Sequence, residues 1–125
     1  MGDRNQVVRL SVPAEAGFAR TVRMMAASLG AACDMGLDDV EDLRMAAEEG
    51  FVYSCATRPE VCDITFALSA RGIAMDFSLG AHIPEDDADS EQSLGLVELL
   101  LSAICEDFSV SEDGSALRLI MSRGE

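Results

Sequence analysis

The sequence predicts a single α+β domain, a two-layer α/β sandwich in which three helices cover one face of a mixed, mostly antiparallel sheet. A length of 125 residues corresponds to one domain spanning 1–125. Some stretches alternate apolar and polar residues, which is typical of strands, and others repeat apolar residues every three or four positions, which is typical of helices. Together they predict the order β-α-α-β-β-α-β-β, with no internal repeat and no linker.

The first strand and first helix follow from their patterns. Residues 6–14, QVVRLSVPA, alternate and stop at Pro13, which predicts a strand. Residues 15–33 predict a helix that buries one face, because apolar side chains recur at helical spacing. These side chains are Phe18, Val22, Met25, Ala26 and Leu29. The loop 33–36 is expected to end this helix.

The second helix is predicted from Asp38 to about Ala56. Asp38 is the expected N-cap, because Glu41 stands three residues later in the capping-box position. Pro59 cannot continue a helix and is expected to end this one.

The second half of the chain predicts one buried helix between two pairs of strands. Residues 62–70 and 72–80 alternate and are separated by a single residue, which predicts a tight hairpin. Residues 93–108 form a third helix, apolar enough to lie largely buried. Residues 108–122 form a closing hairpin, with its turn at Asp113-Gly114.

The charge excludes several functions. The net charge is −14, and all nine basic residues are arginine. No basic face is available to neutralise nucleic-acid phosphates, so direct binding to DNA or RNA is not expected. The absence of lysine excludes a P-loop and Schiff-base chemistry. An acidic surface favours protein partners, and the acidic stretch 81–92 is expected to be a mobile loop.

The cysteines and hydropathy predict a cytoplasmic protein. The four cysteines are scattered and His82 is the single histidine, so a zinc site is not expected. The cysteines are expected to be buried, reduced thiols. The chain opens without the pattern of a secretory signal. No apolar run is long enough for a membrane span.

Four stretches, in this order, resemble the anti-sigma factor serine kinases, a branch of the histidine-kinase-like ATPases. The stretches are RLSVPAEAGFARTVRMMAASLG, GLDDVEDLRMAAEEGFVYSCA, SLGLVELLLSAICEDFSV and DGSALRLIMS, which cover nearly the whole chain. The resemblance implies the histidine-kinase-like ATPase fold, ATP and Mg²⁺ as cofactors, and a possible homodimer. It also implies a role in transcription regulation by partner switching.

The resemblance assigns a role to each position of the nucleotide site. Glu49 stands where the family has its general base. Tyr53 stands where the family has the asparagine that holds magnesium. Ser78 replaces the aspartate that binds adenine, and Gly80 matches a glycine of the same motif, whose second glycine is His82 here.

The remaining nucleotide-binding motif of the family is a glycine-rich turn before the third helix. Leu94, Gly95 and Leu96 match it, and Ser93 replaces its first glycine. A glycine near the start of an apolar helix suggests a close backbone approach, either to a ligand or to the sheet.

The replacements predict an eroded nucleotide site. A phenol is neutral near pH 7 and is a poor replacement for a magnesium ligand. Exchanging a carboxylate for a hydroxyl removes a charged acceptor worth about 1.5–3 kcal/mol. Because phosphoryl transfer depends on positioning and charge neutralisation, weak or no kinase activity is expected. The chain is then expected to act as a regulatory module that binds a sigma factor or an anti-sigma factor antagonist.

Other interpretations of the same residues stay open. The chain could be an active serine kinase that phosphorylates the antagonist with Glu49 as base, or it could bind nucleotide weakly without metal. It could also share the fold alone, because a fold does not fix a function. Without the resemblance, Glu49 would be an ordinary solvated helix residue, Tyr53 a half-buried aromatic and His82 a loop residue.

Overall fold

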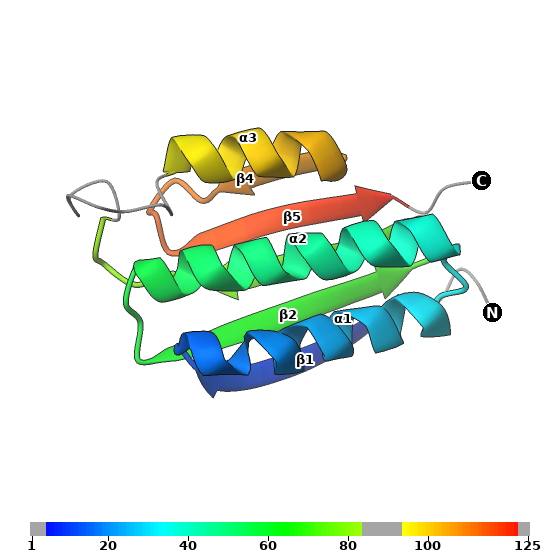
Figure 1. The fold of residues 1–125 in the computed structure, drawn as a ribbon, viewed down its shortest axis with the longest axis horizontal. Coiled ribbons are helices and arrows are strands. Elements are labelled where there is room, and N and C mark those ends of the chain that lie inside the picture. The colour runs from blue at the N-terminus through cyan, green and yellow to red at the C-terminus, as the bar shows by residue number, and fades with distance from the viewer. Residues whose placement is uncertain (1–4, 84–93, 123–125) are drawn as a thin grey trace.

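A five-stranded antiparallel sheet carries three helices on one face. The structure is a computed structural model that describes residues 5–83 and 94–122. In chain order the elements are β1 (Gln6–Pro13), a 3-10 turn (Ala16–Phe18), α1 (Ala19–Ala32), α2 (Leu37–Ala56), β2 (Val61–Ser69), β3 (Gly72–Ser78), α3 (Leu94–Ile104), β4 (Asp107–Val110) and β5 (Ala116–Ser122). This order is the predicted one, and Figure 1 shows all three helices on the same side of the sheet.

The sheet has the strand order β1-β2-β3-β5-β4. Every pair of neighbouring strands in the described residues is antiparallel. The prediction of a mixed sheet is therefore wrong, whereas the prediction of mostly antiparallel pairing is confirmed. The register pairs Phe66 with Met75, and Met75 with Leu119, across three adjacent strands. β1 and β4 are the two outer strands.

The core lies between the sheet and the helices because the strands alternate. In β2 every second residue is buried, from Cys62 to Leu68. The same alternation in β3 and β5 places one apolar row of each strand under the helices. The largest fully buried side chains are Val22, Leu43, Phe51, Ile64, Phe66, Ile73, Met75, Phe77, Leu101, Leu117 and Leu119.

Two glycines let α2 pack closely. A Cβ atom on Gly30 of α1 would lie 2.9 Å from a side-chain carbon of Leu43 on α2. A Cβ atom on Gly50 of α2 would lie 2.5 Å from the ring of Phe77 on β3. A larger side chain at either position would require its neighbour to shift, so both glycines favour the close approach of α2 to α1 and the sheet.

The start of α2 differs from the prediction. The N-cap is Gly36 and not Asp38, and no side chain caps this helix end. Asp38 lies instead in the first turn with Asp39, where a carboxylate stabilises the positive end of the helix dipole. The preceding bend uses Asp34 in a left-handed conformation, with φ of 60°.

α3 is less buried than predicted. Val97 and Leu101 are buried, but Leu99 is 68% exposed and Leu100 is 43% exposed. The helix is apolar all round and contacts the rest of the domain along one side, so its composition overstated its burial. Most of the acidic stretch 81–92 lies outside the described residues.

Candidate functional site

α2 carries the two residues that the resemblance places at the centre of a nucleotide site. Glu49 is half-buried, whereas Tyr53 is 6% exposed and belongs to the hydrophobic core. Burial, and then the charge of Glu48, raises the pKa of Glu49 above its ordinary value. α2 therefore presents a carboxyl group with a raised pKa one turn before a buried phenol.

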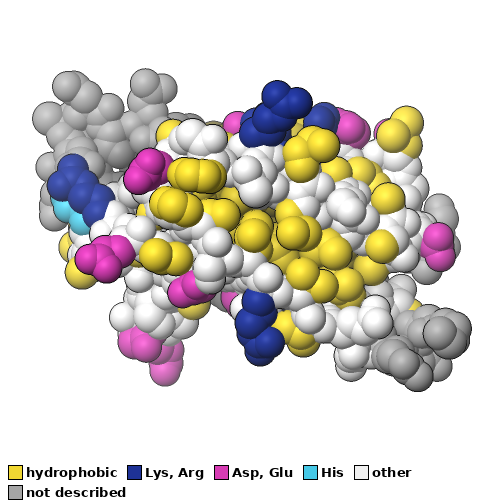
Figure 2. Space-filling model, turned by 90° about the horizontal axis from the view of Figure 1, so that it is seen from below, with side chains coloured by type: hydrophobic (Ala, Val, Ile, Leu, Met, Phe, Trp, Pro, Cys, Tyr) yellow, Lys and Arg dark blue, Asp and Glu magenta, His cyan; other side chains and the backbone are white. Residues whose placement is uncertain are grey.

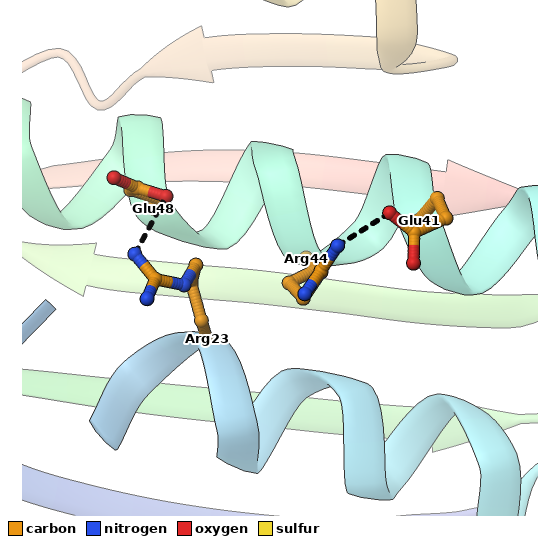
Figure 3. Close-up of polar contacts among 4 residues, drawn as sticks. All are labelled: Arg23, Glu41, Arg44 and Glu48. Carbon is orange, nitrogen blue, oxygen red and sulfur yellow. Dashed lines mark hydrogen bonds and ion pairs between the residues drawn. The ribbon is translucent and has the colours of Figure 1, made fainter. Parts of the chain in front are cut away.

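Glu48 has a structural role that separates it from Glu49. Its carboxylate accepts a hydrogen bond from the guanidinium of Arg23 on α1 at 3.1 Å, as Figure 3 shows. A second pair in the same view, Arg44 with Glu41, lies within α2. Because both ion pairs are partly exposed, each contributes no more than about 1 kcal/mol. The Glu48 carboxylate thus joins α1 and α2, whereas no such ion pair to another helix is seen for Glu49 among the described residues.

Ser78 lies at the end of β3 with both of its polar groups engaged. Its hydroxyl accepts a hydrogen bond from the backbone N–H of Asp63 at 2.9 Å. Its carbonyl oxygen accepts one from the hydroxyl of Ser54 at 2.6 Å. Ser54 is fully buried, and this bond ties α2 to the end of β3. Ser78 therefore acts as a junction between two strands and a helix.

Gly80 lies against the C-terminal end of α2. Its N–H donates to the hydroxyl of Thr57 at 2.7 Å, and that hydroxyl donates to the carbonyl of Ser54 at 2.6 Å. A Cβ atom on Gly80 would lie 2.2 Å from the carbonyl oxygen of Thr57. The same carbonyl accepts the N–H of His82 at 3.0 Å. The glycine is thus required by a close backbone approach within the protein.

Thr57 was missed in the sequence. It is 3% exposed, and its hydroxyl and carbonyl hold the segment that contains Gly80 and His82. The sequence offers one signal, a small hydroxyl residue directly after the end of a helix. That position becomes informative only once Gly80 is known to pack there.

The glycine-rich turn before the third helix is only partly described. Leu94, Gly95 and Leu96 form the first turn of α3, and their side chains lie outside the described part of the structure. Ser78 and Gly80, in contrast, are both joined to the C-terminal end of α2 by hydrogen bonds.

The thiols and carboxylates of the described residues form no cluster of the kind that holds a metal ion. Within residues 5–83 and 94–122, no group of three or more histidine, cysteine or acidic side chains is placed to hold an ion. None of the four cysteines forms a disulfide; Cys62 is buried and the other three are half-buried. Burial raises the pKa of Cys55 and of Cys105 to about 11, so both are protonated and poorly nucleophilic near neutral pH.

Comparisons with known proteins add no relative. A scan against models of protein families finds no match, and a search of the curated proteins also finds none. Across the described residues, no helix combines the length and the apolar character that crossing a membrane requires. The functional interpretation therefore depends on the geometry above and on the order of the motifs.

Proposed function

We propose that this chain is a regulatory protein of the anti-sigma factor kinase type that works by binding a protein partner. On this proposal its fold is that of the histidine-kinase-like ATPases, its nucleotide site is eroded, and it acts in the cytoplasm. The partner is a sigma factor or an anti-sigma factor antagonist. A domain with three helices over one face of a five-stranded antiparallel sheet is compatible with that fold.

The burial of Tyr53 carries the proposal. Mg²⁺ requires oxygen ligands at near-ideal octahedral positions and usually keeps several waters. A phenol that is 6% exposed and packed in the core does not offer such a position. The residues present at the metal position therefore do not suit Mg²⁺, and no step of phosphoryl transfer is assigned to this chain.

The neighbouring positions support the same conclusion. The hydroxyl of Ser78 accepts from the N–H of Asp63 and the N–H of Gly80 donates to Thr57, so both groups are already used inside the protein. A ligand that recruited the N–H of Gly80 would first have to break its bond to Thr57. Losing a hydrogen bond of this kind costs about 0.5–1.5 kcal/mol, which opposes nucleotide binding at this position.

A direct binding experiment tests the proposal. Purified chain is titrated with candidate sigma factors and antagonists, with and without MgATP, and association is followed by calorimetry. The proposal expects one partner to bind with the same affinity in both conditions. It also expects Glu49→Gln to leave that affinity unchanged. Binding that requires MgATP, or that is lost in Glu49→Gln, would contradict it.

An active serine kinase is the second candidate, and Glu49 is the observation in its favour. A carboxyl group whose pKa is raised by burial resembles a general base tuned toward neutral pH. This candidate expects transfer of labelled phosphate from ATP to a serine of the antagonist, and loss of that transfer in Glu49→Gln. Absence of transfer from the wild-type chain removes it.

A further inference from the structure

Two sides of α2 are taken up by contacts within the protein. Gly50 lies against the ring of Phe77 on β3, so one side of the helix faces the sheet. Glu48 accepts a hydrogen bond from Arg23, so a second side faces α1 (Figure 3). The remaining side faces away from both.

Asp38, Asp42 and Met45 lie on this remaining side. Their spacings of four and three residues place them in one row along the helix. Met45 lies five residues before Gly50, about 140° around the helix, so it points away from the sheet and is 52% exposed. Burial, and then the charge of Asp42, raises the pKa of Cys105 to about 11, so Asp42 lies near the end of α3.

α3 presents an apolar side chain on the same side of the molecule. Leu99 lies two residues before the buried Leu101, about 160° around the helix, so it points away from the core. α2 and α3 are neighbours on one face of the sheet (Figure 1). The axes of packed helices are about 8–10 Å apart, so one further helix, about 10–12 Å in diameter, reaches both Met45 and Leu99. Asp38, Asp42, Met45 and Leu99 together are named the α2–α3 outer surface.

The α2–α3 outer surface is acidic. Asp38 and Asp42 make no ion pair within residues 5–83 and 94–122. Arg44 is the one basic residue of α2, and it is paired with Glu41. α3 contains no basic residue. The exposed methionine and leucine are thus bordered by negative charge that no basic residue of these two helices neutralises.

The side of the molecule formed by β1 and α1 differs in this respect. Hydrophobic side chains gather across its middle, and arginine and acidic side chains both lie around them (Figure 2). A border of mixed charge favours no class of partner. The border of the α2–α3 outer surface has one sign and therefore favours a partner of positive charge.

We propose that the α2–α3 outer surface binds a basic amphipathic helix of a partner protein. The apolar side of that helix would lie along Met45 and Leu99, in the manner of amphipathic helices that dock on exposed apolar side chains. Its lysines or arginines would lie near Asp38 and Asp42. Methionine suits such a contact, because its flexible side chain adapts to different neighbours.

Other occupants fit this surface less well. In a symmetric dimer the surface would meet its own copy, and Asp38 and Asp42 would oppose the same carboxylates. Residues 84–93 of the chain itself carry five carboxylates and no arginine, so like charge opposes their binding here. The inference uses the part of α2 that precedes Glu49 and Tyr53, and it would stand if the proposal of an eroded nucleotide site failed.

The test uses three labelled peptides of about 14 residues, which span about 21 Å as a helix. The first has leucine at every third and fourth position and lysine between them. The second has the same composition in an order without helical spacing, and the third has glutamate in place of lysine. Fluorescence anisotropy with the full chain is expected to show at least about tenfold tighter binding of the first peptide than of either other.

Two conditions make this comparison specific. The titrations are made at about 0.15 M salt, which screens the general attraction of the −14 charge beyond about 8 Å. Hydrogen exchange is measured in parallel and should slow at the backbone amides of α3 when the first peptide is bound.

Paired variants locate the binding surface. The double variant Asp38→Asn, Asp42→Asn is expected to weaken binding of the first peptide at least about threefold, and Met45→Gln about fivefold. The controls make the same kinds of change elsewhere. Glu60→Gln removes a carboxylate beyond the opposite end of α2, and Met24→Gln replaces a similarly exposed methionine of α1. Both controls should change binding less than about twofold, and circular dichroism checks that each variant folds.

Several results would overturn the inference. The first peptide could bind no tighter than the other two, or the double variant and Met45→Gln could bind like the wild type. Equal losses in Met24→Gln and Glu60→Gln would show a general attraction to the acidic chain. A dimer in sedimentation that Met45→Gln dissociates, and that the first peptide does not displace, would assign the surface to a second copy instead.

Discussion

At the scale of single residues, the close approach of α2 to the sheet depends on Gly50. In Gly50→Ala the new methyl group would lie 2.5 Å from the ring of Phe77. Alanine gains about 1 kcal/mol of helix propensity, but overpacking in a core costs about 1–3 kcal/mol. We expect a net loss of stability in urea unfolding. Gly17→Ala, where nothing lies within 4 Å, is the control and should stay within about 0.5 kcal/mol of wild type.

Thr57 provides a second prediction at this scale. Thr57→Val removes the hydroxyl that accepts the N–H of Gly80 and leaves that half-buried donor without its partner. We expect a loss of about 1–3 kcal/mol in the free energy of unfolding. Thr21→Val, at an exposed position, is the control and should change it by less than about 0.5 kcal/mol. Equal stability of the two variants would show that the Thr57 hydroxyl does not hold Gly80.

Two carboxyl groups predict opposite dependences on pH. The raised pKa of Glu49 means that the folded protein holds this proton more tightly than the unfolded chain. Stability associated with Glu49 is therefore present below its ordinary value of 4.5 and is lost as pH rises through the raised pKa. We expect Glu49→Gln to be more stable than the wild type at neutral pH, and the two to converge in acid.

Asp113 is expected to show the opposite dependence of stability on pH. Hydrogen bonds from Ser115 and then Ser111 lower its pKa to about 2 from 3.8. Its contribution is present above 3.8 and is lost as pH falls toward 2. We expect Asp113→Asn to be less stable than the wild type at neutral pH, with the difference vanishing in acid. Unfolding measured across this pH range checks both signs.

At the scale of elements, α3 is held by one side of its surface. Leu101 is fully buried, whereas Leu99 is 68% exposed. Leu101→Ala should cost about 2–5 kcal/mol, because it leaves a cavity in the core. Leu99→Ala removes the same atoms from the exposed side and should cost less than about 0.5 kcal/mol. Similar losses in both variants would mean that α3 packs in another orientation.

The elements also show what the sequence could and could not predict. Periodicity located every strand and helix in order, because apolar spacing reflects which side of each element is buried. It misplaced the N-cap of α2, because Asp38 and Glu41 matched a local capping pattern while the chain bends at Gly36. It overestimated the burial of α3, because an all-apolar helix does not reveal how many sides have neighbours.

The candidate site was less predictable than the fold. Glu49 and Tyr53 could be paired from helical spacing alone. The bonds from Ser54 to Ser78 and from Gly80 to Thr57 join residues more than twenty positions apart. They depend on how β3 ends beside α2, and no local pattern encodes that arrangement. The sequence therefore gave no indication that Ser78 and Gly80 form hydrogen bonds within the protein.

At the scale of the whole molecule, the net charge of −14 bears most directly on what the protein can bind. This charge opposes the binding of nucleic acid and polyphosphates in general. It therefore favours recognition of proteins over chemistry on nucleotides. The central claim of the proposed function is therefore that this chain does not hold MgATP.

Calorimetric titration of the purified chain with MgATP tests that claim most directly. We expect no heat of binding at millimolar nucleotide, because Tyr53, at the position that the resemblance assigns to the magnesium ligand, is buried, and Ser78 and Gly80 are engaged within the protein. The unfolding temperature should also stay unchanged, since a ligand present at about 100 times its dissociation constant would add about 2.7 kcal/mol to stability. A micromolar dissociation constant would contradict the account and return Glu49 to the role of a catalytic base.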